Sequence, residues 1–255
     1  MELRDVVVQF GGVRAVSSLS FQLPWRGFMG LIGPNGAGKT TVFNAITGAV
    51  KPASGDILID SKSLIGLEPH EIADSGIART FQNIRLFPRM TVLENVALAL
   101  HAKPRYPVWK AFLRPASVVK SDAQVEQEAH QCLAVFDLEP YADVRAGTLP
   151  YGLQRKVELA RALARRPKVL LLDEPAAGMN DEESDQLADL LRRVHSEHEV
   201  SIILVEHHID LVMKVCQSVT VLNLGAKLAE GTPEEIQRDL NVIKAYLGDR
   251  RVDHA

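Results

Sequence analysis

Short apolar runs of strand length alternate with stretches of helical periodicity along this chain. The runs at 6–10 and 18–23 flank a turn that contains two glycines, and they predict an opening β-hairpin. A third run at 27–33 ends in glycine and leads through a glycine-rich loop into a helical stretch at 39–48. The chain is therefore expected to begin with two paired strands followed by a strand, a loop and a helix.

The alternation of strands and helices returns later in the chain. Apolar runs predict a strand at 54–61 and two more at 168–173 and 201–207, with a helical stretch at 182–195 between the last two. A strand, a helix and a second strand in this order form a βαβ unit. We therefore predict a parallel sheet that is covered on both faces.

Two other regions complete the expected pattern. From about Leu93 to Arg165 the periodicity is helical and no convincing strand appears. The segment 219–231 predicts a closing hairpin, and 233–248 predicts a terminal helix or pair of helices. The helical region therefore interrupts an α/β core.

Composition fits a globular protein without a membrane span. The chain has 255 residues, of which 46% are hydrophobic and 24% charged, and the net charge of −3 argues against bulk binding to nucleic acid or anionic membranes. Cys132 and Cys216 lie far apart among apolar neighbours, which favours two reduced core thiols over a zinc site. The N-terminus carries acidic residues and no apolar signal-peptide core, so we expect the chain to stay in the cytosol.

One basic segment stands out within the helical region. Residues 101–121 contain five Lys or Arg, three prolines, several aromatics and no Asp or Glu. We favour an exposed connection, and a contact surface for a membrane-embedded partner stays open as the alternative.

The glycine-rich loop carries the clearest chemistry. The sequence GPNGAGKTT begins at Gly33 and fits the pattern G-x-x-x-x-G-K-[ST], with a predicted strand before it and a helix after it. Such a loop curls its backbone N–H groups around phosphate oxygens, the Lys39 ammonium reaches the β- and γ-phosphates, and the Thr40 hydroxyl can bind Mg²⁺. The residues expected to bind the nucleotide are Gly33, Asn35, Gly36, Ala37, Gly38, Lys39, Thr40 and Thr41.

An acidic pair follows the strand at 168–173. Asp173 and Glu174 lie at its carboxyl end, where open α/β sheets bind ligands. We expect Asp173 to hold Mg²⁺ through water and Glu174 to orient the attacking water or accept its proton. A carboxylate directly after the aspartate favours hydrolysis over transfer to a second substrate.

The helix that begins near residue 151 has an unusual entrance. Leu153, Val157, Ala160 and Ala164 share one apolar face of this helix, and four charged residues lie off that face. The residues placed off the face are Arg155, Lys156, Glu158 and Arg161. A proline, an aromatic residue and a glycine introduce this helix, which is not needed for helix formation alone.

Five segments taken in order resemble a known family. GPNGAGKTT, TFQN, PYGLQRKVELARAL, LLLDEP and LVEHH are similar to the motifs of ABC-type ATP-binding subunits, and the resemblance covers essentially the whole chain. It implies an α/β P-loop NTPase fold with a mixed, mainly parallel sheet, an antiparallel β edge and a helical subdomain. It further implies one ATP-binding domain with a core at 1–90 and 167–255 and a helical subdomain at about 91–166.

The resemblance assigns further roles in binding ATP and Mg²⁺. Phe10 matches the aromatic that stacks on adenine, although a core phenylalanine of the strand stays the alternative, and Val16 is expected beside the nucleotide. Gln82 matches the glutamine that touches Mg²⁺ and the attacking water and that links the core to the helical insert. His207 matches the histidine that contacts the γ-phosphate, and His208 is expected to face away.

The entrance to the helix at 151 is also explained by the resemblance. In this family the signature turn, here residues 149–153, faces the phosphate loop of a second subunit, so that ATP lies between two chains. Tyr151 and Gly152 are then expected to contact the partner's nucleotide, with helix N–H groups and a positive dipole aimed at the γ-phosphate. The loop at 176–181 matches the segment that meets the opposite subunit.

The signature turn departs from the common family sequence Leu-Ser-Gly-Gly-Gln. The same positions read Leu149, Pro150, Tyr151, Gly152 and Leu153. Pro150 offers neither a hydroxyl nor an N–H to the phosphate, and one missing charge-assisted hydrogen bond weakens the clamp by roughly 1.5–3 kcal/mol. We therefore predict that this chain's phosphate loop makes the better half-site and that a non-identical ATPase partner suits it.

Finer features resemble the ATPase subunits of bacterial importers for branched-chain amino acids, the longer of their two ATPase types. Relatives with similar signatures import urea, short amides or other hydrophobic or aromatic carboxylates, and the cargo and the choice between homodimer and heterodimer stay open. The implied partners are two transmembrane permeases, a second ATPase subunit and, indirectly, an extracytoplasmic solute-binding protein. The implied location is the cytoplasmic face of the plasma membrane.

Three other function classes compete with this interpretation. A soluble ABC ATPase of translation or DNA repair usually carries two cassettes or long coiled-coil inserts, and neither is present here. A regulatory module that binds ATP without turnover is disfavoured by the intact Lys39, Asp173, Glu174 and His207, while Pro150 keeps it open. A P-loop kinase or GTPase would lack the helical signature and the Asp-Glu pair.

Overall fold

The computed structural model describes residues 1–100 and 116–249, and the chain divides into two compact units. Unit 1 comprises Met1–Arg79 and the described residues from Lys168 onward, and unit 2 comprises Thr80–Pro167. Up to position 115, the basic segment at 101–121 lies outside the described residues.

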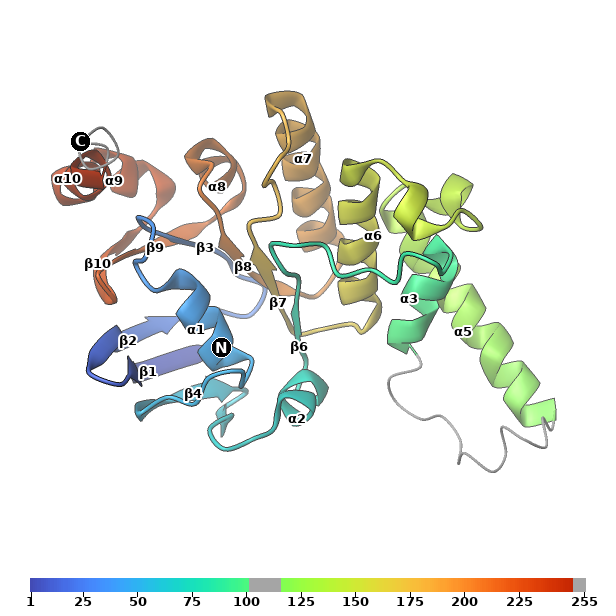
Figure 1. Cartoon of the computed structure of the whole chain (residues 1–255), viewed down its shortest axis with the longest axis horizontal. Coiled ribbons are helices and arrows are strands. Elements are labelled where there is room, and N and C mark those ends of the chain that lie inside the picture. Colours follow the sequence, from blue (N-terminus) through green and yellow to red (C-terminus); the bar gives the residue numbers. More distant parts are fainter. Residues whose placement is uncertain (101–115, 250–255) are drawn as a thin grey trace. The chain divides into compact units, whose positions relative to one another are not determined.

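A six-stranded sheet forms the centre of unit 1 (Figure 1). Its order is β10-β9-β3-β8-β7-β6, and all neighbours are parallel except the antiparallel edge pair β9–β10. Every residue of β3, β7 and β8 is buried, which is why these segments read as continuous apolar runs. The strands are β3 (Phe28–Ile32), β6 (Ile77–Arg79), β7 (Val169–Asp173), β8 (Ser201–Val205), β9 (Ser218–Asn223) and β10 (Ala226–Gly231).

A second, antiparallel sheet in unit 1 has the order β2-β1-β4-β5. It contains the expected opening hairpin, in which β1 and β2 pair directly, Phe10 opposite Val13. One face of this sheet is apolar and the other polar, as the alternating burial along β1 and β2 shows. The strands are β1 (Glu2–Phe10), β2 (Val13–Gln22), β4 (Ser54–Ile59) and β5 (Lys62–Ser63).

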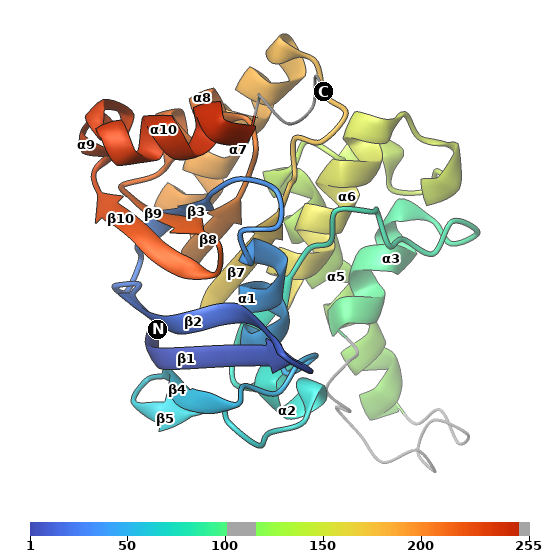
Figure 2. The same ribbon diagram turned by 60° about the vertical axis from the view of Figure 1, so that its left-hand side comes forward.

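Helix α1 lies between the two sheets of unit 1 (Figure 1, Figure 2). Its side chains Val42, Phe43 and Ile46 share one buried core with residues of β1, β2, β4, β3, β7 and β8. Helices α7 and α8 pack on the opposite face of the six-stranded sheet, where the Phe28 ring meets His195 and Gly30 lies against Val212. The helices of unit 1 are α1 (Lys39–Ile46), α2 (Pro69–Asp74), α7 (Asp181–Glu197), α8 (Ile209–Val215), α9 (Pro233–Arg238) and α10 (Leu240–Asp249).

Unit 2 is helical, as the sequence predicts. Its three longer helices pack against one another. The described part of the unit contains no strand, and its only β-type pairing is an isolated bridge between Thr91 and Arg145. Its elements are α3 (Val92–Leu100), α5 (Ala116–Val135), the short 3-10 helices η1 (Glu139–Tyr141) and η2 (Ala146–Thr148), and α6 (Tyr151–Ala164).

The boundary between the units lies about ten residues earlier than the sequence predicts. The expected division kept 80–90 with the core, whereas these residues belong to unit 2. The reason is a side chain of α6, because Arg155 donates hydrogen bonds to the carbonyls of Phe81 and Gln82. A helix of unit 2 thus holds the loop that follows β6.

Two of the charged residues that lie off the apolar face of α6 are buried. Arg155 is 0% exposed and Glu158 is 2% exposed, and they form a buried ion pair at 2.8 Å. The helical period places both residues off the apolar face, and it carries no information about an ion-pair partner. Sequence reasoning also missed β6, which has three residues, and the short helices α2 and α8.

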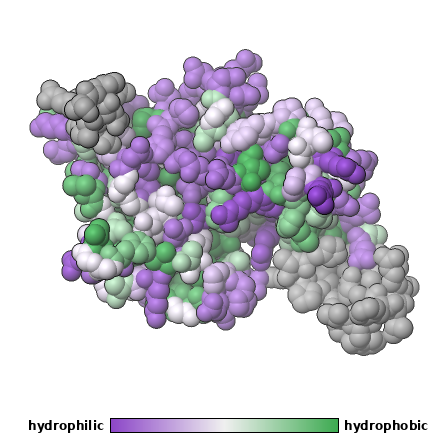
Figure 3. Space-filling view, in the orientation of Figure 1, coloured by the Kyte–Doolittle hydropathy of each residue, from purple (hydrophilic) through white to green (hydrophobic). Residues whose placement is uncertain are grey.

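The face of the molecule seen in Figure 3 is largely hydrophilic, with apolar side chains over parts of both units. On the first hairpin the exposed apolar residues are Phe10 and Val13, at 51% and 69%. None of the described helices combines the length and the apolar character that a bilayer span requires.

Helix α7 begins with a reciprocal cap that can be tested. The Asn180 side chain accepts from the Glu183 N–H at 2.9 Å, and the Glu183 carboxylate accepts from the Asn180 N–H at 3.0 Å. We expect Asn180→Ala to lower the free energy of unfolding by about 1 kcal/mol, measured by urea denaturation. Gln186→Ala, at an exposed position of the same helix, is the control and should leave the midpoint nearly unchanged. Equal losses in both variants would contradict the cap.

Candidate active site

Backbone crowding explains the glycines of the phosphate loop. The loop leaves buried strand β3 at Gly33, whose φ is 151°, and a Cβ atom there would lie 2.1 Å from the Leu222 carbonyl oxygen. Gly38 has φ 102°, and a Cβ there would lie 2.5 Å from the Ala15 oxygen. Only glycine therefore fits at these two positions.

The loop lysine is held inside its own loop. Lys39 is 6% exposed, and its ammonium donates to the carbonyls of Gly33 at 2.6 Å and Pro34 at 2.9 Å. Helix α1 begins at this residue, with Gly38 as its N-cap and no side chain accepting from its first N–H groups. A buried ammonium and the amino end of a helix thus lie together, and both favour an anion.

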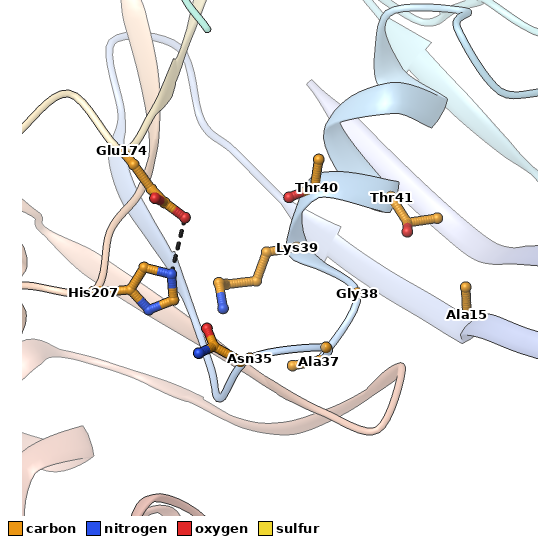
Figure 4. Close-up of a pocket in the computed structure, with 10 residues that line it drawn as sticks. Ala15, Asn35, Ala37, Gly38, Lys39, Thr40, Thr41, Glu174 and His207 are labelled. Carbon is orange, nitrogen blue, oxygen red and sulfur yellow. Dashed lines mark hydrogen bonds and ion pairs between the residues drawn. The ribbon is translucent and has the colours of Figure 1, made fainter. Parts of the chain in front are cut away.

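The loop forms one side of a pocket of about 200 Å³, all within unit 1. Figure 4 shows the Lys39 side chain between Thr40 on one side and the Glu174–His207 pair on the other. The pocket is lined by Ala15, Asn35, Gly36, Ala37, Gly38, Lys39, Thr40, Thr41, Glu174 and His207.

A carboxylate and an imidazole face the loop from two neighbouring strands. Glu174 follows β7 and His207 follows β8, and a hydrogen bond of 2.9 Å joins Glu174 Oε1 to His207 Nε2. Glu174 has a positive φ of 48°, and its N–H donates to the Val205 carbonyl at 2.8 Å. The strand ends therefore fix the pair, and with a carboxylate partner the imidazole can hold a proton on Nε2.

Asp173 lies next to this pair but is held by a different residue. It is 5% exposed, and its Oδ2 atom accepts from Arg79 Nη2 at 2.6 Å. Arg79 also donates to the Asn44 side chain at 2.7 Å and lies over the Phe43 ring. This arrangement ties the end of β7 to β6 and α1.

Sequence reasoning missed the buried carboxylate of Glu206. It accepts from the N–H groups of Ala176 at 2.7 Å, His207 at 3.0 Å and His208 at 3.4 Å. Burial raises the pKa of the Glu206 carboxyl, and these three N–H groups act in the opposite direction. Glu206 thus joins the loop after β7 to the end of β8. An acidic residue directly after an apolar strand was the only sequence signal.

The pocket brings most of the predicted unit 1 residues together. Asn35 to Thr41, Glu174 and His207 all line it, whereas Phe10, Gly33 and Asp173 do not. Val16, expected beside the nucleotide, is fully buried in the core, and Ala15 lies at the pocket instead because neighbours on a strand point to opposite faces. His208 is 54% exposed, as expected for a residue that faces away.

The remaining predicted residues, Gln82, Tyr151 and Gly152, belong to unit 2. Pro150 is the N-cap of α6 and makes no side-chain cap, while Tyr151 is 44% exposed and Gly152 lies in the first turn. A helix start without a side-chain cap leaves its N–H groups available to an outside acceptor.

The oxygen donors present fit the chemistry of Mg²⁺. The Thr40 hydroxyl lies at the pocket, Asp173 is the last residue of β7, and the sequence predicts the Gln82 amide as a further ligand. Hydroxyl, carboxylate and amide oxygens are the donors that this hard cation prefers. The glycine-lined loop and the buried ammonium fit the phosphates that such a cation accompanies.

Comparisons with known proteins agree with the geometry. Residues 16–177 match the family model described as ABC transporter, and 226–252 match one described as branched-chain amino acid ATP-binding cassette transporter. The high-affinity branched-chain amino acid transport ATP-binding protein BraF of Pseudomonas aeruginosa is 42% identical over 249 residues, which is 98% of each chain. LivG of Escherichia coli, with the same description, is 40% identical over 98% of each chain.

Solved structures show the same fold. The ADP conformation of MJ1267, an ATP-binding cassette of an ABC transporter, is 28% identical with a TM-score of 0.84, covering 97% of this chain and 98% of that chain. A nucleotide-free ATP-binding cassette from an ABC transporter is also 28% identical, with a TM-score of 0.81, covering 96% of this chain and 97% of that chain. The α/β fold class expected from the sequence is thereby confirmed. With its family match spanning the phosphate loop and the acidic pair, the chain belongs to the ABC transporter family as one of its ATP-binding cassettes.

Proposed function

We propose that this chain is the ATP-hydrolysing subunit of an importer for branched-chain amino acids. The observation that carries the proposal is that the phosphate loop and the Glu174–His207 pair line the same pocket. The cargo follows from the relatives, since BraF and LivG are described as branched-chain amino acid transport ATP-binding proteins. The C-terminal match at 226–252 supports the same cargo.

Binding of ATP uses groups that are already in place. The backbone N–H groups from Asn35 to Thr41 surround the β- and γ-phosphates, and the Lys39 ammonium exchanges its two carbonyl partners for phosphate oxygens. Phe10, 51% exposed at the end of β1, offers its ring to the adenine. Ala15, at the wall of the pocket, limits the space beside the loop.

Hydrolysis requires a water aimed at the γ-phosphate. Glu174 orients that water and accepts its proton, and His207 stabilises the charge on the phosphate while its hydrogen bond fixes the Glu174 carboxylate. Thr40, Asp173 and Gln82 are the residues that would hold Mg²⁺, which neutralises charge on the phosphates when bound. Residues of this chain thus activate the water, stabilise the phosphate charge and would hold the Mg²⁺ ion.

Transport requires partners that complete this site. The signature turn at 149–153 serves the ATP of a second ATPase subunit, and two permeases receive the motion through the loop of Gln82. A solute-binding protein delivers the cargo from outside, and the chain works at the cytoplasmic face of the membrane. The uncapped start of α6 supports the first of these roles because its N–H groups suit a phosphate.

The cargo assignment is tested with the assembled transporter. The chain is purified with the permeases that accompany it and reconstituted in vesicles with ATP inside. We expect uptake of radiolabelled leucine, competed by isoleucine and valine, and no competition by urea, acetamide or benzoate. Competition by urea, acetamide or benzoate would contradict the assignment of branched-chain amino acids as the cargo. Purification without any permease, combined with full ATPase activity, would favour a soluble ATPase.

Removal of the proposed base should stop hydrolysis and retain binding. We expect Glu174→Gln to lower kcat for ATP by about 10²–10⁴-fold, because the amide cannot accept the proton of water. ATP should then accumulate in the complex. Glu197→Gln, an exposed glutamate at the end of α7, is the control. An unchanged rate in Glu174→Gln would contradict the assignment.

The signature turn offers a second test. Pro150→Ser introduces the hydroxyl that the common signature supplies, so ATP-driven association of the Glu174→Gln protein should tighten by about tenfold. Pro150→Ala is the matched control, since it removes the ring and adds no hydroxyl. Equal affinities for the two variants would show that the missing hydroxyl does not limit the clamp.

A further inference from the structure

Arg155 is the most completely buried charged side chain described in unit 2, at 0% exposure on α6. Its Nη1 atom donates to the Phe81 carbonyl at 2.7 Å and to Glu158 Oε2 at 2.8 Å. Its Nη2 atom donates to the Gln82 carbonyl at 2.7 Å and to the Tyr151 hydroxyl oxygen at 3.0 Å. One guanidinium therefore binds two consecutive carbonyls of the loop that carries Gln82.

The same guanidinium reaches the signature turn. Tyr151 stands where the common family sequence has glycine, and its ring lies 5.7 Å from the Arg155 guanidinium carbon. The Tyr151 hydroxyl accepts the hydrogen bond described above, while 44% of the residue stays exposed. A residue of the signature turn thus contacts the Gln82 loop through one intermediate, Arg155.

The Gln82 loop is bound to α6 at a second point. Glu158 Oε1 accepts from the Arg85 N–H at 3.3 Å, and the Arg85 guanidinium lies 3.9 Å from the centre of the Phe81 ring. Glu158 also balances the charge of Arg155, so the pair can remain buried. The loop from Phe81 to Arg85 is therefore held at both ends by one helical turn of α6.

The geometry requires arginine. Four acceptors surround the two terminal nitrogens, and a planar guanidinium with donors in fixed directions can serve them together, whereas a lysine ammonium has three donors at one point. A residue needed only to fill the space would not require this set of directed bonds. The two bonds to the loop are directed at main-chain carbonyls, so they fix where the loop lies and not which side chains it carries.

We propose that Arg155 is a positioning residue that holds the Gln82 loop to the signature turn. We call this set of contacts the lock: the hydrogen bonds from Arg155 to the Phe81 and Gln82 carbonyls and to the Tyr151 hydroxyl. This inference rests on the proposed function, in which Gln82 serves this chain's own Mg-ATP and the signature turn serves the partner's. A displacement of the signature turn when it meets the partner's phosphate then moves Gln82 with it. The two ATP sites of a dimer are thereby coupled inside unit 2.

Amide hydrogen exchange of the nucleotide-free protein tests the lock directly. Tyr151→Phe removes one hydroxyl from a half-exposed side chain, and we expect exchange of the amides at 81–86 to quicken by about tenfold. The Arg85 amide is the sharpest probe because its N–H donates a hydrogen bond to Glu158. Tyr141→Phe, on η1 in the same unit, is the matched control and should leave exchange unchanged. Unchanged exchange at 81–86 in Tyr151→Phe would overturn the proposal.

A second variant separates positioning from general stability. Arg155→Lys keeps the charge beside Glu158 but cannot bind all four acceptors, so exchange should quicken at 81–86 and stay the same in α3 and α5. Faster exchange throughout unit 2 would mean that Arg155 only stabilises the fold, and would also overturn the proposal.

Kinetics give an independent measure of the same lock. In both variants the Mg²⁺ concentration at half-maximal ATPase rate should rise several-fold, with a smaller change in KM for ATP, because Gln82 is the proposed Mg²⁺ ligand. If the wild-type chain neither binds nor hydrolyses ATP, the proposed function fails. The exchange data would still decide whether the lock exists, so the two failures are distinguishable.

Discussion

The adjacency of β3, β8 and β7 in one parallel sheet is the constraint on which the active site depends. Parallel neighbours end at the same edge, so the phosphate loop after β3, His207 after β8 and Glu174 after β7 arrive at one place although they are far apart in the sequence. The buried faces of these three strands fix their register. A slip of one residue in β8 would carry His207 away from Glu174.

Around this edge the structure uses charged and polar groups to hold strand ends and the loops that follow them. Arg79 ties Asp173 to α1, and Glu206 gathers three N–H groups of the loops after β7 and β8. In unit 2, Arg155 does the same for the loop of Gln82. These buried contacts cost desolvation free energy, which is offset because each charge is paired or fully hydrogen-bonded.

Much of this architecture could be predicted from the sequence, and the failures share a physical cause. The apolar runs located β3, β7 and β8, and the glycine pattern located the phosphate loop, because burial and backbone crowding restrict residue types directly. Arg155, Glu158 and Glu206 were misjudged or missed since a charged residue normally marks the surface, and only three-dimensional partners reverse that rule. The three residues of β6 were too few to show a period.

The positive φ of Glu174 has a consequence for the stability of the fold. A glutamate in the left-handed region carries about 1–3 kcal/mol of conformational strain that a glycine would not. The hydrogen bond from its N–H to Val205 and the packing of the two strands oppose this strain. Glycine would therefore be the more stable residue at this position, whereas the proposed chemistry needs the glutamate carboxylate. Selection for thermal stability alone would favour glycine over glutamate here, so the role proposed for Glu174 in turnover would come at a cost in stability.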